Sequence, residues 1–326
     1  MKQTSHGFTL VELAVALTIV ALVIGGLAVP LSKRLSEQQY TDTQANIDKA
    51  VEALVGFAIL NRRLPCPDVN TASAGNPDTR DGIEDIAGAS GAITGCSIGV
   101  AGTAATSANY HSDADGVSWG DLPYQTLGLA SPNNADAWNN RLRYAVFTPL
   151  VTQVGTISPP APAVPGTVCS GNFGLSNLGC TTPTALSTAN AQLDIRCGNP
   201  VTTTVATAAP GCLSTSVPPY SVSQNAVLVV YSVGANGWGS TSIVNLATAA
   251  KMAFTTALQT SLPDQAINAT EVKSSGTIAG ASALRRQFVV RARTDGSSGT
   301  GEFDDLLTFM SSPMLASRLM NAGVWP

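Results

Sequence analysis

Charged and aromatic side chains are scarce in this sequence, and histidine is almost missing. Only 12% of the 326 residues are Asp, Glu, Lys or Arg, 6% are aromatic and two are His. The formal net charge is −4 and no basic tract occurs, so nucleic-acid binding has no electrostatic support. With two His and no Cys-x-x-Cys, a zinc site is not expected.

Signatures of catalysis are missing as well. The sequence has no Gly-x-x-x-x-Gly-Lys phosphate loop and no Gly-x-Ser-x-Gly elbow. His111 lies close to Asp113, but nothing in their spacing favours a Ser-His-Asp site. We therefore expect a structural or interaction subunit rather than an enzyme.

Cysteine is present in an even number, and every cysteine follows the first 65 residues. This usage favours disulfides and an oxidising compartment. Six cysteines allow 15 pairings, and we expect neighbours along the chain to pair, as 66–96, 169–180 and 197–212. The six are Cys66, Cys96, Cys169, Cys180, Cys197 and Cys212.

One long apolar run follows a short polar leader at the N-terminus. Gly7 and Phe8 end the leader, and the run lasts from Leu13 to about Val29, enough to reach across most of a hydrocarbon core of about 30 Å. Glu12 stands at its start, although an ionised side chain at membrane depth costs at least about 2.5 kcal/mol. A carboxylate in this position predicts that Glu12 has a functional role.

Two ordinary alternatives explain this segment less well. A secretory signal peptide needs a small-residue cleavage site after the apolar run, and Gly25-Gly26-Leu27-Ala28 is a poor one. A plain single-span anchor leaves Glu12 and Gly7-Phe8 unexplained. Lys33 and Arg34 after the run weakly oppose an N-terminus in the cytoplasm.

Residues 7–12, Gly-Phe-Thr-Leu-Val-Glu, resemble the class III signal of type IV prepilins and type II secretion pseudopilins. The resemblance implies that a prepilin peptidase cuts between Gly7 and Phe8 and methylates the new N-terminus of Phe8. It implies that Glu12 pairs with the N-terminus of a neighbouring subunit during assembly. It also places the protein in the bacterial inner membrane with its head in the periplasm, and then in a pilus or pseudopilus. The implied partners are other pilin or pseudopilin subunits, the peptidase, the inner-membrane assembly platform and membrane lipid.

The chain then divides into four parts. Residues 1–7 form the leader to be removed, 8–30 the transmembrane or filament-core half of a helix, and 31–63 its amphipathic half. From Ile47 the apolar residues are spaced by 4, 3, 1, 3 and 1, which is one helical face. The helix should end near Arg62, because Leu64-Pro65-Cys66-Pro67 cannot continue it.

Residues 64–326 are expected to form an α+β head of the type IV pilin kind. Residues 66–118 are predicted to be loop, and alternating patterns predict strands over 142–147, 226–232 and 287–293, joined in an antiparallel sheet packed on the helix. Residues 148–224 form a long disulfide-stapled insertion, either a specialised surface or a cover for the sheet. Apolar spacing predicts a helix over 243–258, and a second helix is predicted to begin at Phe303. A last short helix is predicted from the N-cap Ser312 and Pro313 to a stop at Gly323.

Two turn motifs of the head are similar to those of the major pseudopilin. They are Asp136-Ala-Trp-Asn-Asn with the later Tyr144, and Ser232-Val-Gly-Ala-Asn236-Gly. In that family this region holds a structural calcium ion, but Ala137, Asn139 and Asn236 depart from the pattern. We therefore expect no cofactor. The residues that would be the candidates for binding calcium are Asp136, Asn236, Asp304 and Asp305. The Asp304-Asp305 pair is explained more simply by the dipole of a helix starting there.

The preferred function is that of a minor pilin in a type IV pilus. The first alternative is a pseudopilin of a type II secretion system. A bulky head would favour a position at the tip of the pseudopilus, because it is tolerated there more easily than at repeated positions. The second is an adhesin that binds through residues 148–224.

Overall fold

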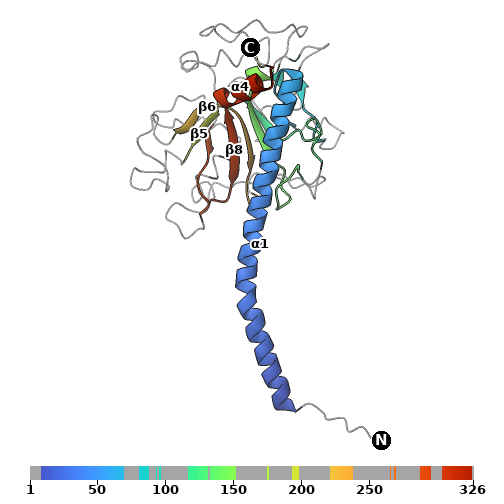
Figure 1. Ribbon diagram of the computed structural model, residues 1–326, viewed down its shortest axis with the longest axis vertical. Helices are drawn as coiled ribbons and strands as arrows, with labels where there is room; N and C mark the ends of the chain where they lie inside the picture. Colours follow the sequence, from blue (N-terminus) through green and yellow to red (C-terminus); the bar gives the residue numbers. More distant parts are fainter. Residues whose placement is uncertain are drawn as a thin grey trace, which may run out of the picture. The chain divides into compact units, whose positions relative to one another are not determined.

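The computed structural model describes residues 9–69, 81–87, 93, 95–96, 117–130, 133–151, 175, 193–197, 221–237, 265, 268, 287–294 and 303–324. The chain forms two compact units, Met1–Asp42 and Thr43–Pro326. The second unit is called the head below, and it includes the C-terminal turns of the first helix (Figure 1).

Helix α1 runs from Leu10 to Asn61 and is 52 residues long. The prediction of one long helix that ends near Arg62 is confirmed. Arg62 itself has φ of 59°, a left-handed conformation that leaves the helix, and its N–H still donates to the Ala58 carbonyl oxygen at 3.0 Å. Pro65 follows shortly afterwards and prevents the helix from resuming.

The head contains a six-stranded sheet of order β3-β4-β6-β5-β7, with β8 also paired to β6. The predicted strands over 142–147 and 226–232 are confirmed as β4 and β6, but the sheet is mixed rather than antiparallel, because β5 and β7 run parallel. A separate pair is formed by β1 and β2. The bounds are β1 Ile86–Ala87, β2 Gly95–Cys96, β3 Val117–Asp121, β4 Arg143–Phe147, β5 Leu193–Arg196, β6 Ser221–Ser232, β7 Gln287–Val289 and β8 Leu306–Ser311; the 3₁₀ turn η2 spans Thr148–Leu150.

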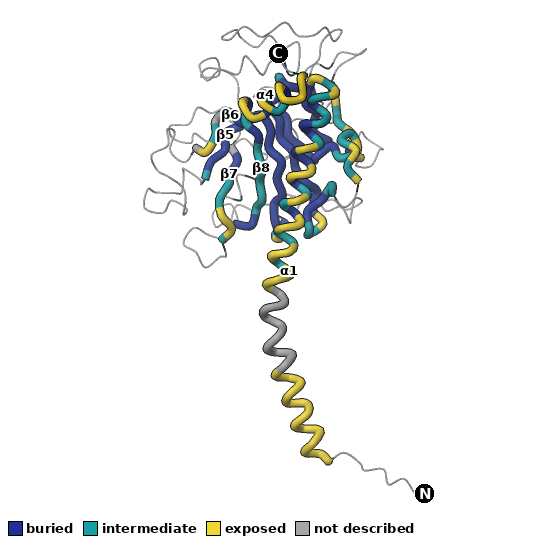
Figure 2. Tube along the Cα trace, in the orientation of Figure 1, coloured by how far each residue is buried: buried dark blue, intermediate teal, exposed yellow. Residues whose placement is uncertain are grey.

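Apolar side chains are buried on both faces of the sheet. On one face, Leu228 and Val230 of β6 join a cluster with Ile47, Leu54 and Ala58 of helix α1. The intervening residues of β6 join a second cluster on the opposite face, because successive strand residues point to opposite sides. Its β6 members include Val229 and Tyr231, and strands β3, β4, β5 and β7 contribute Trp119, Ala145, Leu193 and Phe288. Figure 2 shows these strands as predominantly buried.

The predicted helix starting at Phe303 is wrong, because Leu306–Ser311 is strand β8. Its apolar residues serve both faces of the sheet: Leu306 and Met310 pack with the first cluster, and Leu307 and Phe309 with the second. A strand with two apolar faces lacks the polar alternation that distinguishes it from a helix. The helix-dipole explanation for the Asp304-Asp305 pair fails with it.

The last helix is confirmed as α4, Ser312–Asn321. Its N-cap is Ser311 rather than Ser312, one residue earlier than predicted, and Pro313 lies in the first turn. Gly323 has φ of 68°, so it ends the helix as expected. Helix α4 contacts β6 and β8, and its Leu315 and Leu319 join the same cluster as helix α1.

Two segments expected to lack regular structure contribute strands. Residues 66–118 contain β1, β2 and the start of β3. Residues 148–224 contain η2, all of β5 and the start of β6, so this stretch is partly built into the sheet rather than added to it. The helix predicted over 243–258 lies outside the described residues.

Candidate functional site

The start of helix α1 forms a capping box around Glu12. The N–H and the Oγ1 hydroxyl of Thr9 both donate to Glu12 Oε2 at 2.9 Å. In return, the Glu12 N–H donates to Thr9 Oγ1 at 3.3 Å. This reciprocal pair satisfies N–H groups that a helix start leaves without a partner. Thr9 was not singled out from the sequence, although Thr-x-x-Glu before an apolar run is the signal for such a box.

Apolar side chains after this box are exposed along the first turns of α1. The exposed fraction is 84% for Leu10 and still 73% for Leu22. All described side chains from Thr9 to Leu22 belong to the exposed class, including Glu12 (Figure 2). Within the part of the chain that the structure describes, no helix reaches the length and apolarity needed to cross a membrane. Gly7 and Phe8, the predicted cleavage site, lie outside the described residues.

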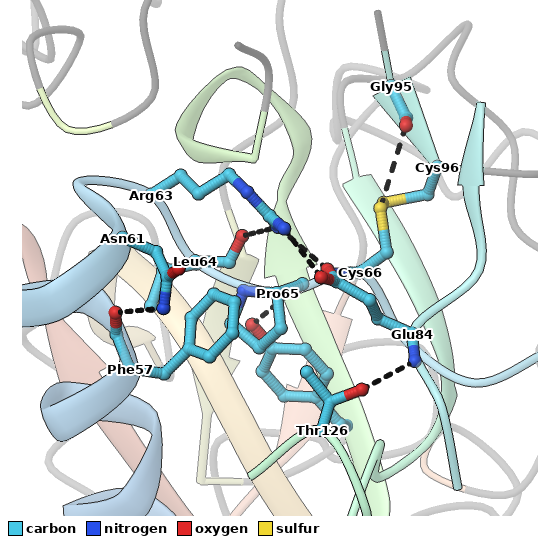
Figure 3. A network of polar contacts seen from close by, with 11 residues as sticks. Phe57, Asn61, Arg63, Leu64, Pro65, Cys66, Glu84, Gly95, Cys96 and Thr126 are labelled. Atoms are coloured by element: carbon cyan, nitrogen blue, oxygen red, sulfur yellow. Dashed lines mark hydrogen bonds and ion pairs between the residues drawn. A yellow bond between two sulfur atoms is a disulfide. The ribbon is translucent and has the colours of Figure 1, made fainter. Parts of the chain in front are cut away.

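Just after α1 ends, a largely buried ion pair joins Arg63 to Glu84 within the head. Arg63 Nη1 lies 2.7 Å from Glu84 Oε2, and the two side chains are only 8% and 13% exposed (Figure 3). The same Glu84 oxygen accepts the N–H of Cys66 at 3.0 Å, and the Glu84 N–H donates to Thr126 Oγ1 at 2.9 Å. Glu84 therefore joins three separate stretches of chain, with a structural role.

Cys66 and Cys96 form a disulfide beside this ion pair (Figure 3). The structure thus contains the first of the three pairings expected from chain neighbours. Cys197 is also disulfide-bonded. Cys169, Cys180 and Cys212 lie outside the described residues, so the pairings 169–180 and 197–212 stay predictions.

Asp136, the first calcium candidate, is 5% exposed and fully engaged in hydrogen bonds. Its Oδ1 accepts the N–H groups of Trp138 at 2.9 Å and Asn140 at 2.7 Å. Its Oδ2 accepts Ser232 Oγ at 2.7 Å and Asn140 Nδ2 at 3.1 Å. Burial raises the pKa of Asp136, and these hydrogen bonds oppose that rise. The carboxylate thereby fixes the 136–140 turn against the end of β6.

Asp304 and Asn236, two further candidates, contact each other directly. Asp304 Oδ2 accepts the Asn236 N–H at 3.0 Å, and Oδ1 accepts Asn236 Nδ2 at 2.8 Å. Gln265 Nε2 also donates to Asp304 Oδ1, and Gln265 Oε1 accepts from Asn236 Nδ2 at 3.0 Å. Gly234 permits this approach, because a Cβ there would lie 2.4 Å from the Asp304 carbonyl oxygen.

Asp305, the last candidate, belongs to a neighbouring amide contact. Asn268 Nδ2 donates to Asp305 Oδ2 and to the Val289 carbonyl oxygen, each at 2.9 Å. Asn268 Oδ1 accepts the Val289 N–H at 2.8 Å. Gln265 and Asn268 were not found from the sequence, since no local pattern links them to partners this far along the chain. Among the described residues, no group of three or more His, Cys, Asp or Glu is placed to hold a metal ion.

A second buried acidic region lies where β3 meets the loop after α1. Asp68 Oδ2 accepts the Gly82 N–H at 2.8 Å, and Arg141 Nη1 lies 3.7 Å from the same oxygen. Burial, helped by the negative charge of Asp121, raises the pKa of Asp68 to about 8. Burial also raises the pKa of Asp85 to about 6. These raised pKa values predict that the stability of the head depends on pH.

Residues 2–28 match the family described as "Prokaryotic N-terminal methylation motif". This motif is the class III signal of type IV pilins and pseudopilins, so the resemblance seen in residues 7–12 is confirmed. No curated protein and no solved structure matches the chain. The chain therefore carries the signal of a type IV pilin-like or pseudopilin precursor, which implies processing by prepilin peptidase and assembly with other pilin-type subunits.

Proposed function

We propose that this protein is a minor pilin, made as an inner-membrane precursor and assembled into a type IV pilus through its first helix. The observation that carries the proposal is the methylation motif at residues 2–28. Within this motif, the apolar side chains from Leu10 to Leu22 are exposed, and Glu12 lies among them. In this proposal, cleavage between Gly7 and Phe8 creates a cationic, methylated N-terminus. The protein acts without catalytic residues or a cofactor.

The proposed mechanism uses Glu12 to set the register between subunits. A charge in lipid is costly when it is alone, and a carboxylate and an amine neutralise each other when subunits bring them together. The apolar side chains from Leu10 to Leu22 would first contact lipid and then neighbouring helices. The Cys66–Cys96 disulfide supports a head on the oxidising, periplasmic side of the membrane.

A minor rather than a major subunit is proposed because of the head. The head carries the long 148–224 stretch, which adds β5 to its sheet. A bulky head is more readily accommodated at low copy number or at a tip than at every repeat of a filament. The same argument applies to the alternative, a type II secretion pseudopilin, so an experiment has to separate the two machines.

The first test is quantitative mass spectrometry of sheared surface filaments and of the washed envelope. It follows the N-terminal peptide that begins at Phe8 and carries one added methyl group. A processed protein that is scarce beside a major pilin in the sheared fraction supports the minor pilin. A processed protein confined to the envelope favours the secretion pseudopilin, and an unprocessed N-terminus in both fractions contradicts the proposal.

The second test separates the charge of Glu12 from its capping role. Glu12→Gln keeps a side chain that can complete the capping box with Thr9 but has no charge. If charge pairing sets the register, Glu12→Gln and Glu12→Ala are both inserted and cleaved but fail to enter filaments. The matched control is Glu37→Gln, an exposed glutamate on the same helix, which should assemble normally. Normal incorporation of Glu12→Gln would rule out the charge mechanism.

A further inference from the structure

Among the residues that the structure describes, three nitrogen donors form hydrogen bonds to the carboxylate of Asp304. They come from the N–H and Nδ2 of Asn236 and from Nε2 of Gln265. Asp304 itself is 4% exposed and Gln265 is 1% exposed, so the contact is shielded from water. A hydrogen bond to a charged group is stronger than one between neutral groups, particularly where water is excluded.

This arrangement does not fit a calcium ion. Calcium takes about six to eight oxygen ligands at roughly 2.3–2.6 Å. At Asp304 the positive ends of amide N–H groups already face both carboxylate oxygens, which a cation would need for itself. The Asp136 oxygens likewise accept four donors from Trp138, Asn140 and Ser232. The carboxylate oxygens of Asp136 and Asp304 therefore already accept hydrogen bonds from protein donors.

We propose that Asp304 is a structural anchor that binds amides in place of a cation, and that the head folds without calcium. Its carboxylate joins the turn after β6, through Asn236, to residue 265 and to the start of β8. A calcium ion would link such segments by binding oxygen ligands from each of them. Here the N–H groups of Asn236 and Gln265 bind the carboxylate of Asp304 instead. This inference does not depend on which machine uses the protein.

The test is thermal unfolding of the full-length chain in detergent, with EGTA or with millimolar calcium. Tryptophan fluorescence reports on the head, since all four Trp lie beyond residue 42. We expect the same midpoint in both buffers for the wild-type chain. A site filled by calcium at about 100 times its Kd would raise the midpoint by roughly 5–10 °C. Such a rise, abolished in Asp304→Asn, would overturn the proposal.

The anchor itself is tested by Asn236→Asp, which replaces a donor by a second carboxylate of nearly the same shape. We expect its midpoint in EGTA to be lower than that of the wild type by roughly 3–10 °C. The matched control is Asn321→Asp, the same charge change at the exposed last residue of α4, where repulsion from the helix dipole should lower the midpoint by at most about 3 °C. Asn236→Ala removes the side-chain donor without adding a charge and serves if Asn236→Asp does not fold. Wild-type midpoints for both Asn236 variants would also overturn the proposal.

Discussion

The two parts of helix α1 are both rich in apolar residues, but they differ in what covers them. In the first part, Leu17 is 62% exposed and Ile19 is 56% exposed. In the part that belongs to the head, Leu54 and Ala58 are fully buried against the sheet, and Val55 is 5% exposed. Figure 2 shows the stretch 9–22 as exposed and the head part of α1 as exposed on some residues only.

This difference separates folding from assembly along one helix. Burial of apolar area stabilises a protein by about 25 cal/mol per Å², so the head part already contributes to the stability of the single chain. The side chains from Leu10 to Leu22 are exposed and contribute little until lipid or another subunit covers them. Substitutions in the two parts should therefore affect different measurements.

The largest expected contrast is between Leu54→Ala and Leu17→Ala. Leu54→Ala removes a fully buried side chain and should lower the free energy of unfolding of the head by about 2–5 kcal/mol. Leu17→Ala should leave that free energy unchanged and should instead weaken filament incorporation. Denaturant unfolding followed by tryptophan fluorescence measures the first effect, and the sheared filament fraction measures the second.

The two variants control for each other, because both remove the same atoms from a leucine on the same helix. Equal losses of head stability would show that the exposed part of α1 is covered within the single chain. That result would remove the distinction between folding and assembly.

Removing the Cys66–Cys96 disulfide should affect the head alone. The bridge closes a loop between residues 30 positions apart, for which chain entropy predicts a contribution of about 3–4 kcal/mol. We expect Cys66→Ala with Cys96→Ala to unfold at a lower denaturant concentration than wild type. Membrane insertion and N-terminal processing should be unchanged, as measured by carbonate extraction and mass spectrometry of the N-terminus. Loss of processing in the double variant would contradict a separate role for the head.

Much of helix α1 and part of the sheet could be predicted because their signals are local. Helical spacing from Ile47 and the stop at Pro65 gave the helix, and alternation gave β4. Strand β5 was missed although its sequence, Leu-Asp-Ile-Arg, alternates between apolar and charged residues as a short strand does. In the structure both charged residues are buried as an ion pair, with Arg196 Nε 2.7 Å from Asp194 Oδ2. The alternation was therefore visible, but the two charges gave no sign that both faces of the strand would be buried.

The N-terminal site could be predicted, and the Asp304 contacts could not. Gly7, Phe8 and Glu12 lie within a short linear motif, so their relation is visible in the sequence. Gln265 meets Asp304 across 39 residues, and only the folded sheet brings them together. The motif around Asn236 pointed to the right region of the head, but it could not show that an amide from another segment binds there.

A pH-dependent effect is expected from Asp68 in the head. Its folded-state pKa of about 8 exceeds the usual value of about 4, so the folded head holds a proton that the unfolded chain releases. This contribution is complete below about pH 4 and is lost as the pH rises to about 8, by up to about 1.4 kcal/mol per pH unit. Asp68→Asn should remove this loss, as measured by unfolding at several pH values.

The control for this prediction is Asp48→Asn, an exposed carboxyl on α1, which should keep the wild-type pH dependence. Asp85, with a pKa of about 6, should leave some dependence below about pH 6 in Asp68→Asn. An unchanged slope between about pH 6 and 8 in that variant would show that Asp68 is ionised in the folded head.

The smallest effect is expected from the ion pair between Arg318 of α4 and Glu52 of α1. Their side chains are 39% and 63% exposed, and such pairs contribute about 0–1 kcal/mol. Arg318→Ala should therefore lower the unfolding free energy by at most about 1 kcal/mol, and less at high salt, since salt screens exposed charges. Arg318→Lys, which keeps the charge, is the control. A loss similar to that of Leu54→Ala would mean that α4 is held to α1 by this pair rather than by the buried Leu315 and Leu319.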